Sequence, residues 1–73
     1  MTDQTVGEVQ KRGGEVIKVC RKQYRGHDLV DVRVYIAGGA EDGGDQPTRK
    51  GLCCSPERWR RLLPLVEQAL EET

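Results

Sequence analysis

The spacing of hydrophobic residues predicts a β-hairpin in the first half of the chain. Residues 15–21 are rich in β-branched types and follow two glycines, which is typical of a strand. Residues 29–36 alternate strictly between two faces. One face carries Val30, Val32, Val34 and Ile36, and the other carries Leu29, Asp31, Arg33 and Tyr35. Because Gly26 lies between the two strands, we expect a hairpin whose tip is residues 24–27.

The second half predicts a short strand, residues 48–54, followed by a helix. Ser55, Pro56 and Glu57 are a typical helix start, because they suit the cap, the first turn and the helix dipole. Apolar residues then recur at steps of three and four, namely Trp59, Leu62, Leu63, Val66 and Leu70. Pro64 lies within this stripe without ending it, so we predict a kinked helix.

Two segments lack a hydrophobic pattern. Residues 1–13 are polar and run into two glycines, so we predict a mobile N-terminal arm. Residues 37–47 hold four glycines and three acids, and they predict a flexible loop. The folded domain is therefore expected to span residues 14–73.

Composition indicates that this domain needs a partner. Of the 73 residues, 36% are hydrophobic and none is Phe, and the core of so small a domain rarely supplies more than about 3–5 kcal/mol. The three cysteines are odd in number and two are adjacent, which argues against a disulfide framework and favours a reducing, intracellular compartment. No stretch reaches the ~18 apolar residues of a membrane span. A second copy of the chain is the expected stabilising partner.

The helix is the expected surface for that second copy. Leu65 and Ala69 widen its apolar surface beyond a single stripe. The predicted homodimer interface is Trp59, Leu62, Leu63, Leu65, Val66, Ala69 and Leu70.

Charge is neutral overall but unevenly placed. The chain has 12 Lys and Arg against 12 Asp and Glu. Residues 11–35 carry seven basic and three acidic side chains, and residues 49–61 carry five and one, so each segment has a net charge of +4. Most of the acids lie in the glycine-rich loop and at the two ends. Neutrality therefore does not exclude a nucleic-acid ligand.

The hairpin tip combines an aromatic ring with cations. Tyr24 stands between Lys22 and Arg25, with Arg33 and the pair Arg49 and Lys50 elsewhere on the predicted sheet. Rings on an open sheet stack on unpaired bases while cations follow the phosphates. The alternative is an ordinary solvated hairpin, and spacing alone favours it.

Other chemistry is poorly supported. Cys20, Cys53, Cys54 and the single histidine, His27, lack the chelating spacing of a zinc site and form no convincing nucleophile and base pair. The glycines of the loop lie among acids and match no phosphate-binding motif. We predict no catalytic residue, no metal and no cofactor.

Two stretches resemble a known family when taken together and in order. The first is Tyr24-Arg25-Gly26, followed by Leu29-Val30-Asp31-Val32-Arg33-Val34-Tyr35. The second is Pro47-Thr48-Arg49-Lys50-Gly51-Leu52, followed by Ser55-Pro56-Glu57 and Trp59. They are similar to the single-stranded-DNA-binding domain of the positive cofactor four family of transcriptional coactivators, and more closely to its short bacterial members.

The resemblance implies an α+β fold, in which a curved antiparallel sheet of about four strands is followed by one kinked C-terminal helix, and a homodimer. It also implies a nucleic-acid interface made of Lys22, Tyr24, Arg25, His27, Arg33, Pro47, Arg49, Lys50, Ser55 and Arg58. Two positions depart from the family. His27 replaces a permanent cation, so its contribution should grow as the pH falls. Ile36 replaces a second aromatic, so affinity should be lower than is usual for the family.

We therefore expect sequence-nonspecific binding of single-stranded DNA or melted duplex by a homodimer, in transcription or DNA metabolism. RNA is an alternative ligand, and the transcription machinery is a further expected partner. We place the protein in the bacterial cytoplasm or nucleoid rather than in a nucleus. The alternative function is a dimeric protein-interaction module that does not bind nucleic acid, and an enzyme is the least favoured class.

Overall fold

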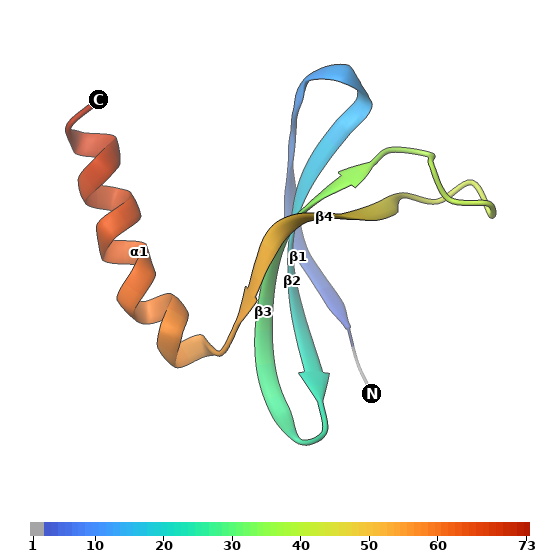
Figure 1. Ribbon diagram of the computed structural model, residues 1–73. Coiled ribbons are helices and arrows are strands. Elements are labelled where there is room, and N and C mark those ends of the chain that lie inside the picture. The colour runs from blue at the N-terminus through green and yellow to red at the C-terminus, as the bar shows by residue number, and fades with distance from the viewer. Residues whose placement is uncertain (1–2) are drawn as a thin grey trace.

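The computed structural model describes residues 3–73 (Figure 1). Four antiparallel strands form one sheet in the order β1-β2-β3-β4, and one helix follows. The elements are β1 (Gln4–Gln10), the 3-10 turn η1 (Arg12–Gly14), β2 (Glu15–Tyr24), β3 (His27–Ile36), β4 (Gln46–Cys54) and α1 (Pro56–Glu71). The expected α+β fold, with four strands and a C-terminal helix, is confirmed.

The predicted mobile arm is wrong for the residues that β1 occupies, whereas Met1 and Thr2 lie outside the described residues. β1 pairs with β2 from Gln4, opposite Arg21, to Gln10, opposite Val16, with an irregularity at Val6. Every residue of β1 is exposed, so no hydrophobic pattern marks it. The strand forms because it satisfies the backbone N–H and C=O groups along the edge of β2.

The predicted hairpin is confirmed as β2 and β3, which pair without interruption from Glu15, opposite Ile36, to Tyr24, opposite His27. Arg25 and Gly26 form the turn, with φ of 51° and 80°. Positive φ at both central positions matches the twist of the flanking strands, which allows a two-residue turn. The hairpin tip is therefore tightly defined.

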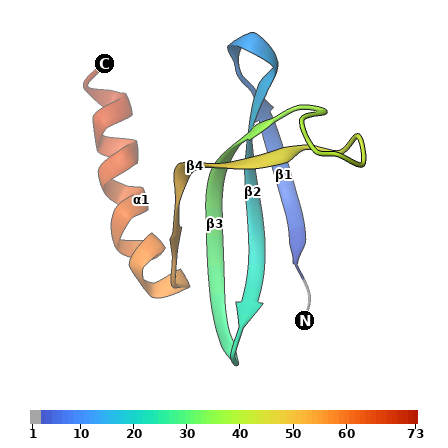
Figure 2. The same ribbon diagram turned by 45° about the vertical axis from the view of Figure 1, so that its right-hand side comes forward.

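β4 begins at Gln46, two residues earlier than expected, so the loop spans residues 37–45. Its pairing with β3 is irregular, because Arg33 lies opposite Gly51 but Tyr35 lies opposite Pro47. The additional residues let β4 bend across the sheet (Figures 1 and 2). A Cβ atom at Gly51 would lie 2.6 Å from the carbonyl oxygen of Val32, so this crossing requires glycine.

The strands present two different faces. One, here called the polar face, carries side chains that contact or lie opposite one another: Lys18, Cys20 and Lys22 of β2, Asp31, Arg33 and Tyr35 of β3, and Cys53 of β4. The other, here called the apolar face, carries Val19, Val30, Val32, Leu52 and Cys54. Buried residues are few: within residues 3–73 they are Val16, Cys20, Asp31 and Cys54.

α1 is attached to the apolar face by its first turns. The side chain of Ser55 accepts from the backbone N–H of Arg58, and Trp59 Nε1 donates to the carbonyl oxygen of Val30 at 2.7 Å. The helix continues through Pro64 as one element, and its kink stays a prediction. Both views show the C-terminal part of α1 standing clear of the sheet (Figures 1 and 2). Within residues 3–73, no helix is long and apolar enough to cross a membrane.

Candidate nucleic-acid interface

The hairpin tip presents an aromatic ring and a cation together. Tyr24 is 56% exposed, and the guanidinium carbon of Arg25 lies 5.2 Å from the centroid of its ring. His27 lies directly opposite Tyr24 in the strand pairing. An exposed ring beside a cation can stack on a base and contact a neighbouring phosphate at the same time.

A buried carboxylate organises the centre of the polar face. Asp31 has a relative exposure of 0%, and it accepts from Arg33 Nε at 3.1 Å and from Arg33 Nη2 at 3.0 Å. The ammonium of Lys22 lies 3.4 Å from the same carboxylate. Two cations therefore share one anion, and the cluster keeps a net charge of +1.

The carboxylate of Asp31 stabilises the charged forms of both Arg33 and Lys22. The hydrogen bonds that Arg33 donates to Asp31 raise the pKa of Arg33 above its usual range. For Lys22, desolvation is the largest influence and lowers the pKa, but the attraction and hydrogen bonding of Asp31, with smaller attractions from Tyr35 and Asp3, outweigh it, so the pKa rises above 10.5. Both side chains are positive at neutral pH.

Arg33 is nevertheless committed to contacts within the protein. Besides its two bonds to Asp31, its Nη1 donates to the carbonyl oxygen of Thr48 at 2.9 Å. This bond ties β3 to the bent part of β4. Arg33 thus lies on the predicted nucleic-acid interface and adds positive charge there. Its contacts also hold Asp31 and β4 in place, and with Asp31 the neighbouring Lys22.

A second group on the polar face consists of Lys18, Tyr35 and Asp45. The ammonium of Lys18 lies 2.7 Å from Asp45 Oδ2 and 4.8 Å from the centroid of the Tyr35 ring. The hydrogen bond to Asp45 is the main reason why the pKa of Lys18 is raised above 10.5, and the same bond lowers the pKa of Asp45 below 3.8. Burial raises the pKa of Tyr35 above 10.0, so its phenol is neutral.

Sequence reasoning did not select Lys18 for the interface. The signal was present, because Lys18 and Lys22 are four residues apart on one strand and alternation places both on the face of Cys20. Alternation predicts Tyr35 on the face opposite Ile36, and the structure places it there, on the polar face with Lys18.

β4 supplies the remaining sheet cations. Arg49 and Lys50 are exposed on its bent part, and within residues 3–73 neither has a carboxylate within salt-bridge distance. Thr48 fixes this part of the strand, because its hydroxyl donates to the carbonyl oxygen of Val34 at 2.7 Å and accepts from the backbone N–H of Lys50 at 3.2 Å. Pro47 lies opposite Tyr35.

The helix start lies apart from the polar face. The hydroxyl of Ser55 is engaged in capping α1, and Arg58 is exposed one residue before Trp59. No hydrogen bond or ion pair within residues 3–73 joins either side chain to the hairpin tip. The structure therefore brings Lys22 close to Arg33, and Tyr24 close to Arg25. It does not bring Ser55 or Arg58 close to either pair.

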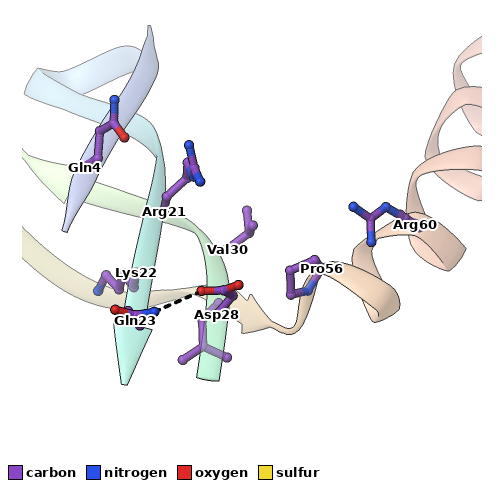
Figure 3. Close-up of a pocket in the computed structure, with 9 residues that line it drawn as sticks. Gln4, Arg21, Lys22, Gln23, Asp28, Val30, Pro56 and Arg60 are labelled. Atoms are coloured by element: carbon purple, nitrogen blue, oxygen red, sulfur yellow. Dashed lines mark hydrogen bonds between the residues drawn. The ribbon is translucent and has the colours of Figure 1, made fainter. Parts of the chain in front are cut away.

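A cleft of about 450 Å³ lies between the hairpin and the helix start (Figure 3). Arg21 of β2 and Arg60 of α1 stand on its two sides, and Pro56 and Val30 lie between them (Figure 3). Neither arginine was selected from the sequence. The cleft adds positive charge next to the tip of the hairpin.

Solved structures share this architecture. A PC4 homologue from Burkholderia pseudomallei K96243 in an orthorhombic crystal form is 30% identical, with a TM-score of 0.83 over 99% of this chain and 95% of that one. The tetragonal form gives 31% identity and a TM-score of 0.80 over 93% and 97% of the two chains. The bacteriophage T5 homologue of the eukaryotic coactivator PC4, implicated in recombination-dependent DNA replication, is 20% identical, with a TM-score of 0.75 over 99% of this chain and 81% of that one.

The open four-stranded sheet with one C-terminal helix is thus the fold of a small coactivator-type DNA-binding domain. The sequence also matches the family described as Transcriptional Coactivator p15 (PC4) over residues 11–65, which is more than half of the chain. A comparison with curated proteins gave no match. The chain belongs to the PC4 family, and its bacterial and phage structural relatives agree with a resemblance to short bacterial members.

Proposed function

We propose that this protein binds single-stranded DNA without sequence preference, as a homodimer, through the hairpin tip and the polar face. The observation that carries the proposal is the exposed ring of Tyr24 with Arg25 at 5.2 Å, at the end of a face that already carries Lys22 and Arg33. Membership of the PC4 family supports the same conclusion.

The mechanism combines stacking with neutralisation of phosphates. A base stacks on Tyr24, and stacking contributes roughly 1–3 kcal/mol per base. Arg25, Arg49 and Lys50 contact phosphates directly, while Lys22 and Arg33 add the positive charge of the Asp31 cluster. Every DNA sequence offers base rings for stacking and phosphates for ion pairing, so this mode of binding is independent of sequence. Pro47 and His27 complete the proposed contact set on the sheet, and Ser55 and Arg58 are proposed contacts at the start of α1, apart from the polar face.

The proposed homodimer forms through α1 and the apolar face. A groove between the sheet and the helix is lined by Val19, Val30, Val32, Trp59 and Leu63. Leu65, Val66 and Leu70 are also exposed, and no residue of α1 is buried. So much exposed apolar surface on so short a chain marks an interaction site. The proposed contacts are Trp59, Leu62, Leu63, Leu65, Val66, Ala69 and Leu70.

The biological role follows the family. We place the protein in transcription regulation or DNA metabolism, with the transcription machinery as a further partner. The family is described as that of a transcriptional coactivator, and the T5 relative is implicated in DNA replication. We propose no enzymatic activity.

A fluorescence titration with oligothymidine at two salt concentrations tests the function. Affinity should fall with rising salt, with a slope of about −0.7 per neutralised phosphate. Tyr24→Ala and Arg49→Ala should each weaken binding. Arg12→Ala is the matched control, because Arg12 lies in η1, at the other end of the β2–β3 pair from the hairpin tip (Figure 1). Absence of binding by the unaltered protein at low salt would refute the function.

The second candidate is a dimeric protein-interaction module, which the exposed apolar surface of α1 favours. It differs from the first in one measurement. If the unaltered protein is dimeric but does not bind oligothymidine at low salt, the interaction module becomes the better interpretation; if it binds and the double variant Tyr24→Ala with Arg49→Ala keeps that affinity, these two residues are not the binding surface.

A further inference from the structure

The loop of residues 37–45 reaches the polar face through one residue. Asp45 Oδ2 lies 2.7 Å from the ammonium of Lys18, and Asp45 Oδ1 accepts from the backbone N–H of Gly38 at 3.1 Å. Among the salt bridges within residues 3–73, this is the one that joins the loop to the sheet. The charged residues of the loop are all acidic, namely Glu41, Asp42 and Asp45.

We propose that Lys18 is a further phosphate-contacting residue of the polar face, and that Asp45 holds it until nucleic acid displaces the loop. The proposal rests on the function proposed above. Lys18 lies on the same face as the Asp31 cluster, and the ring of Tyr35 lies 4.8 Å from its ammonium. A phosphate oxygen accepts from an ammonium as a carboxylate does, so the two anions compete for one site.

The pair is accessible enough to exchange partners. The side chains of Lys18 and Asp45 are 18% and 29% exposed, so an incoming phosphate can reach the ammonium once the carboxylate moves away. Lys18 does not lose its place when Asp45 leaves, because the Tyr35 ring remains beside it. Glu8 lies opposite Lys18 on β1 and is the other nearby acid, and its influence on Lys18 is smaller than that of Asp45.

The loop is held mainly by contacts within itself. Apart from Ala37, whose N–H donates to the carbonyl oxygen of Gly14 at 2.8 Å, its backbone hydrogen bonds are short-range, from Gly39 N–H to the carbonyl of Ile36 and between Ala40, Gly43 and Gly44. Asp42 accepts from the backbone N–H of Gly44 at 2.9 Å, so this acid is used within the loop. Asp45 is the acid that links the loop to Lys18, and it therefore sets how strongly the loop covers the polar face.

Oligothymidine titrations of four variants of the full chain test the proposal. The variants are Asp45→Asn, Asp42→Asn, Lys18→Gln and the double variant Lys18→Gln with Asp45→Asn. Asn keeps an oxygen that can accept from the backbone N–H groups of Gly38 or Gly44, so both loop variants remove one negative charge with little change of shape. Circular dichroism during heating checks that each variant is folded.

We expect Asp45→Asn to bind roughly 2- to 5-fold more tightly than the unaltered protein, the range for an exposed ion pair. Its salt dependence should be steeper by up to about 0.7, because one more cation is free to neutralise a phosphate. Asp42→Asn should change affinity less. Lys18→Gln should abolish the effect of Asp45→Asn, so the double variant should match Lys18→Gln alone.

Each outcome decides a different question. Equal affinities for Asp45→Asn and Asp42→Asn would mean that only net charge matters, and they would overturn the proposal. The proposal is also overturned if Asp45→Asn still tightens binding when Lys18 is replaced by Gln. Both of these results leave the proposed function intact. Failure of the unaltered protein to bind at low salt overturns the proposed function and this proposal with it.

Discussion

Arg33 and Asp31 form a two-point contact at the centre of the sheet. Nε and Nη2 of Arg33 donate to the two carboxylate oxygens of Asp31, at 3.1 and 3.0 Å, and the carboxylate is fully buried. These residues are two apart on β3, so they lie on the same face. Arg33 also bonds to Thr48 on β4, which makes this pair a junction between the charged surface and the bend of the sheet.

Removing the anion of this junction should destabilise the fold. Asp31→Ala leaves the guanidinium of Arg33 and the ammonium of Lys22 close together without their shared carboxylate. Breaking a buried pair costs about 3–5 kcal/mol, and the partial exposure of both cations reduces this to roughly 2–4 kcal/mol in the free energy of unfolding. Urea unfolding followed by circular dichroism measures the loss.

Glu15→Ala is the control for Asp31→Ala. It breaks the more exposed ion pair between Lys11 and Glu15, and it should change the free energy of unfolding by no more than about 0.5 kcal/mol. Similar losses in the two variants would contradict the organising role of Asp31.

Gly51 should tolerate no side chain, although its backbone is not in the left-handed region. A Cβ atom there would lie 2.6 Å from the carbonyl oxygen of Val32 and 2.7 Å from Cα of Arg33, and both are backbone atoms that cannot move aside. Gly51→Ala should therefore lower the free energy of unfolding by about 1–3 kcal/mol, as overpacking does. Thermal and urea unfolding measure it.

Gly7→Ala provides the matched comparison for Gly51→Ala. Gly7 is also a strand glycine, but a Cβ atom there meets nothing within 4 Å. Its replacement should be neutral or slightly stabilising, because Ala reduces the freedom of the unfolded chain. If the two variants were equally stable, the close approach of β3 and β4 would not be a constraint.

The elements that could be predicted from the sequence are those that bury apolar side chains or show turn chemistry. Alternation from Leu29 to Ile36 identified β3 and its two faces, and Ser55 with Pro56 identified the start of α1. β1 could not be predicted from the hydrophobic pattern, because its residues are all exposed. Its backbone pairing with the edge of β2 requires no regular spacing of apolar residues. The local pattern marked three strands, and the family resemblance supplied the fourth.

The candidate site was harder to predict because sequence does not show which charges pair. The sequence predicts that Arg33 faces phosphates, but three of its hydrogen bonds are made within the protein. The ion pair of Lys18 could not be predicted either, because its partner Asp45 is 27 positions away on a loop. Proximity of this kind depends on the bend of β4, which follows from the irregular pairing near Arg33.

The Asp45 contact should respond to acid. Hydrogen bonds from Lys18 and from the N–H of Gly38 lower the pKa of Asp45 below 3.8, so the contact is fully formed above the pKa of the unfolded chain. It should be lost as the pH falls through the lower, folded-state value. Nuclear magnetic resonance of the Gly38 amide should show a transition with a midpoint below 3.8, and Asp45→Asn should abolish that transition. A midpoint above 3.8 would contradict the contact.

The proposed dimer makes Val66 a sensitive position. Val66 is 49% exposed and lies on the same stripe of α1 as Leu63 and Leu70. Burial of this apolar side chain against a second copy would favour association. Val66→Asp places a charge in that interface, and the cost of removing this charge from water would oppose dimer formation. Sedimentation at micromolar concentration should show a dimer for the unaltered protein and a monomer or unfolded chain for the variant. Gln68→Asp introduces the same charge two positions along α1 and should remain dimeric, whereas a stable folded monomer of the unaltered protein would rule the dimer out.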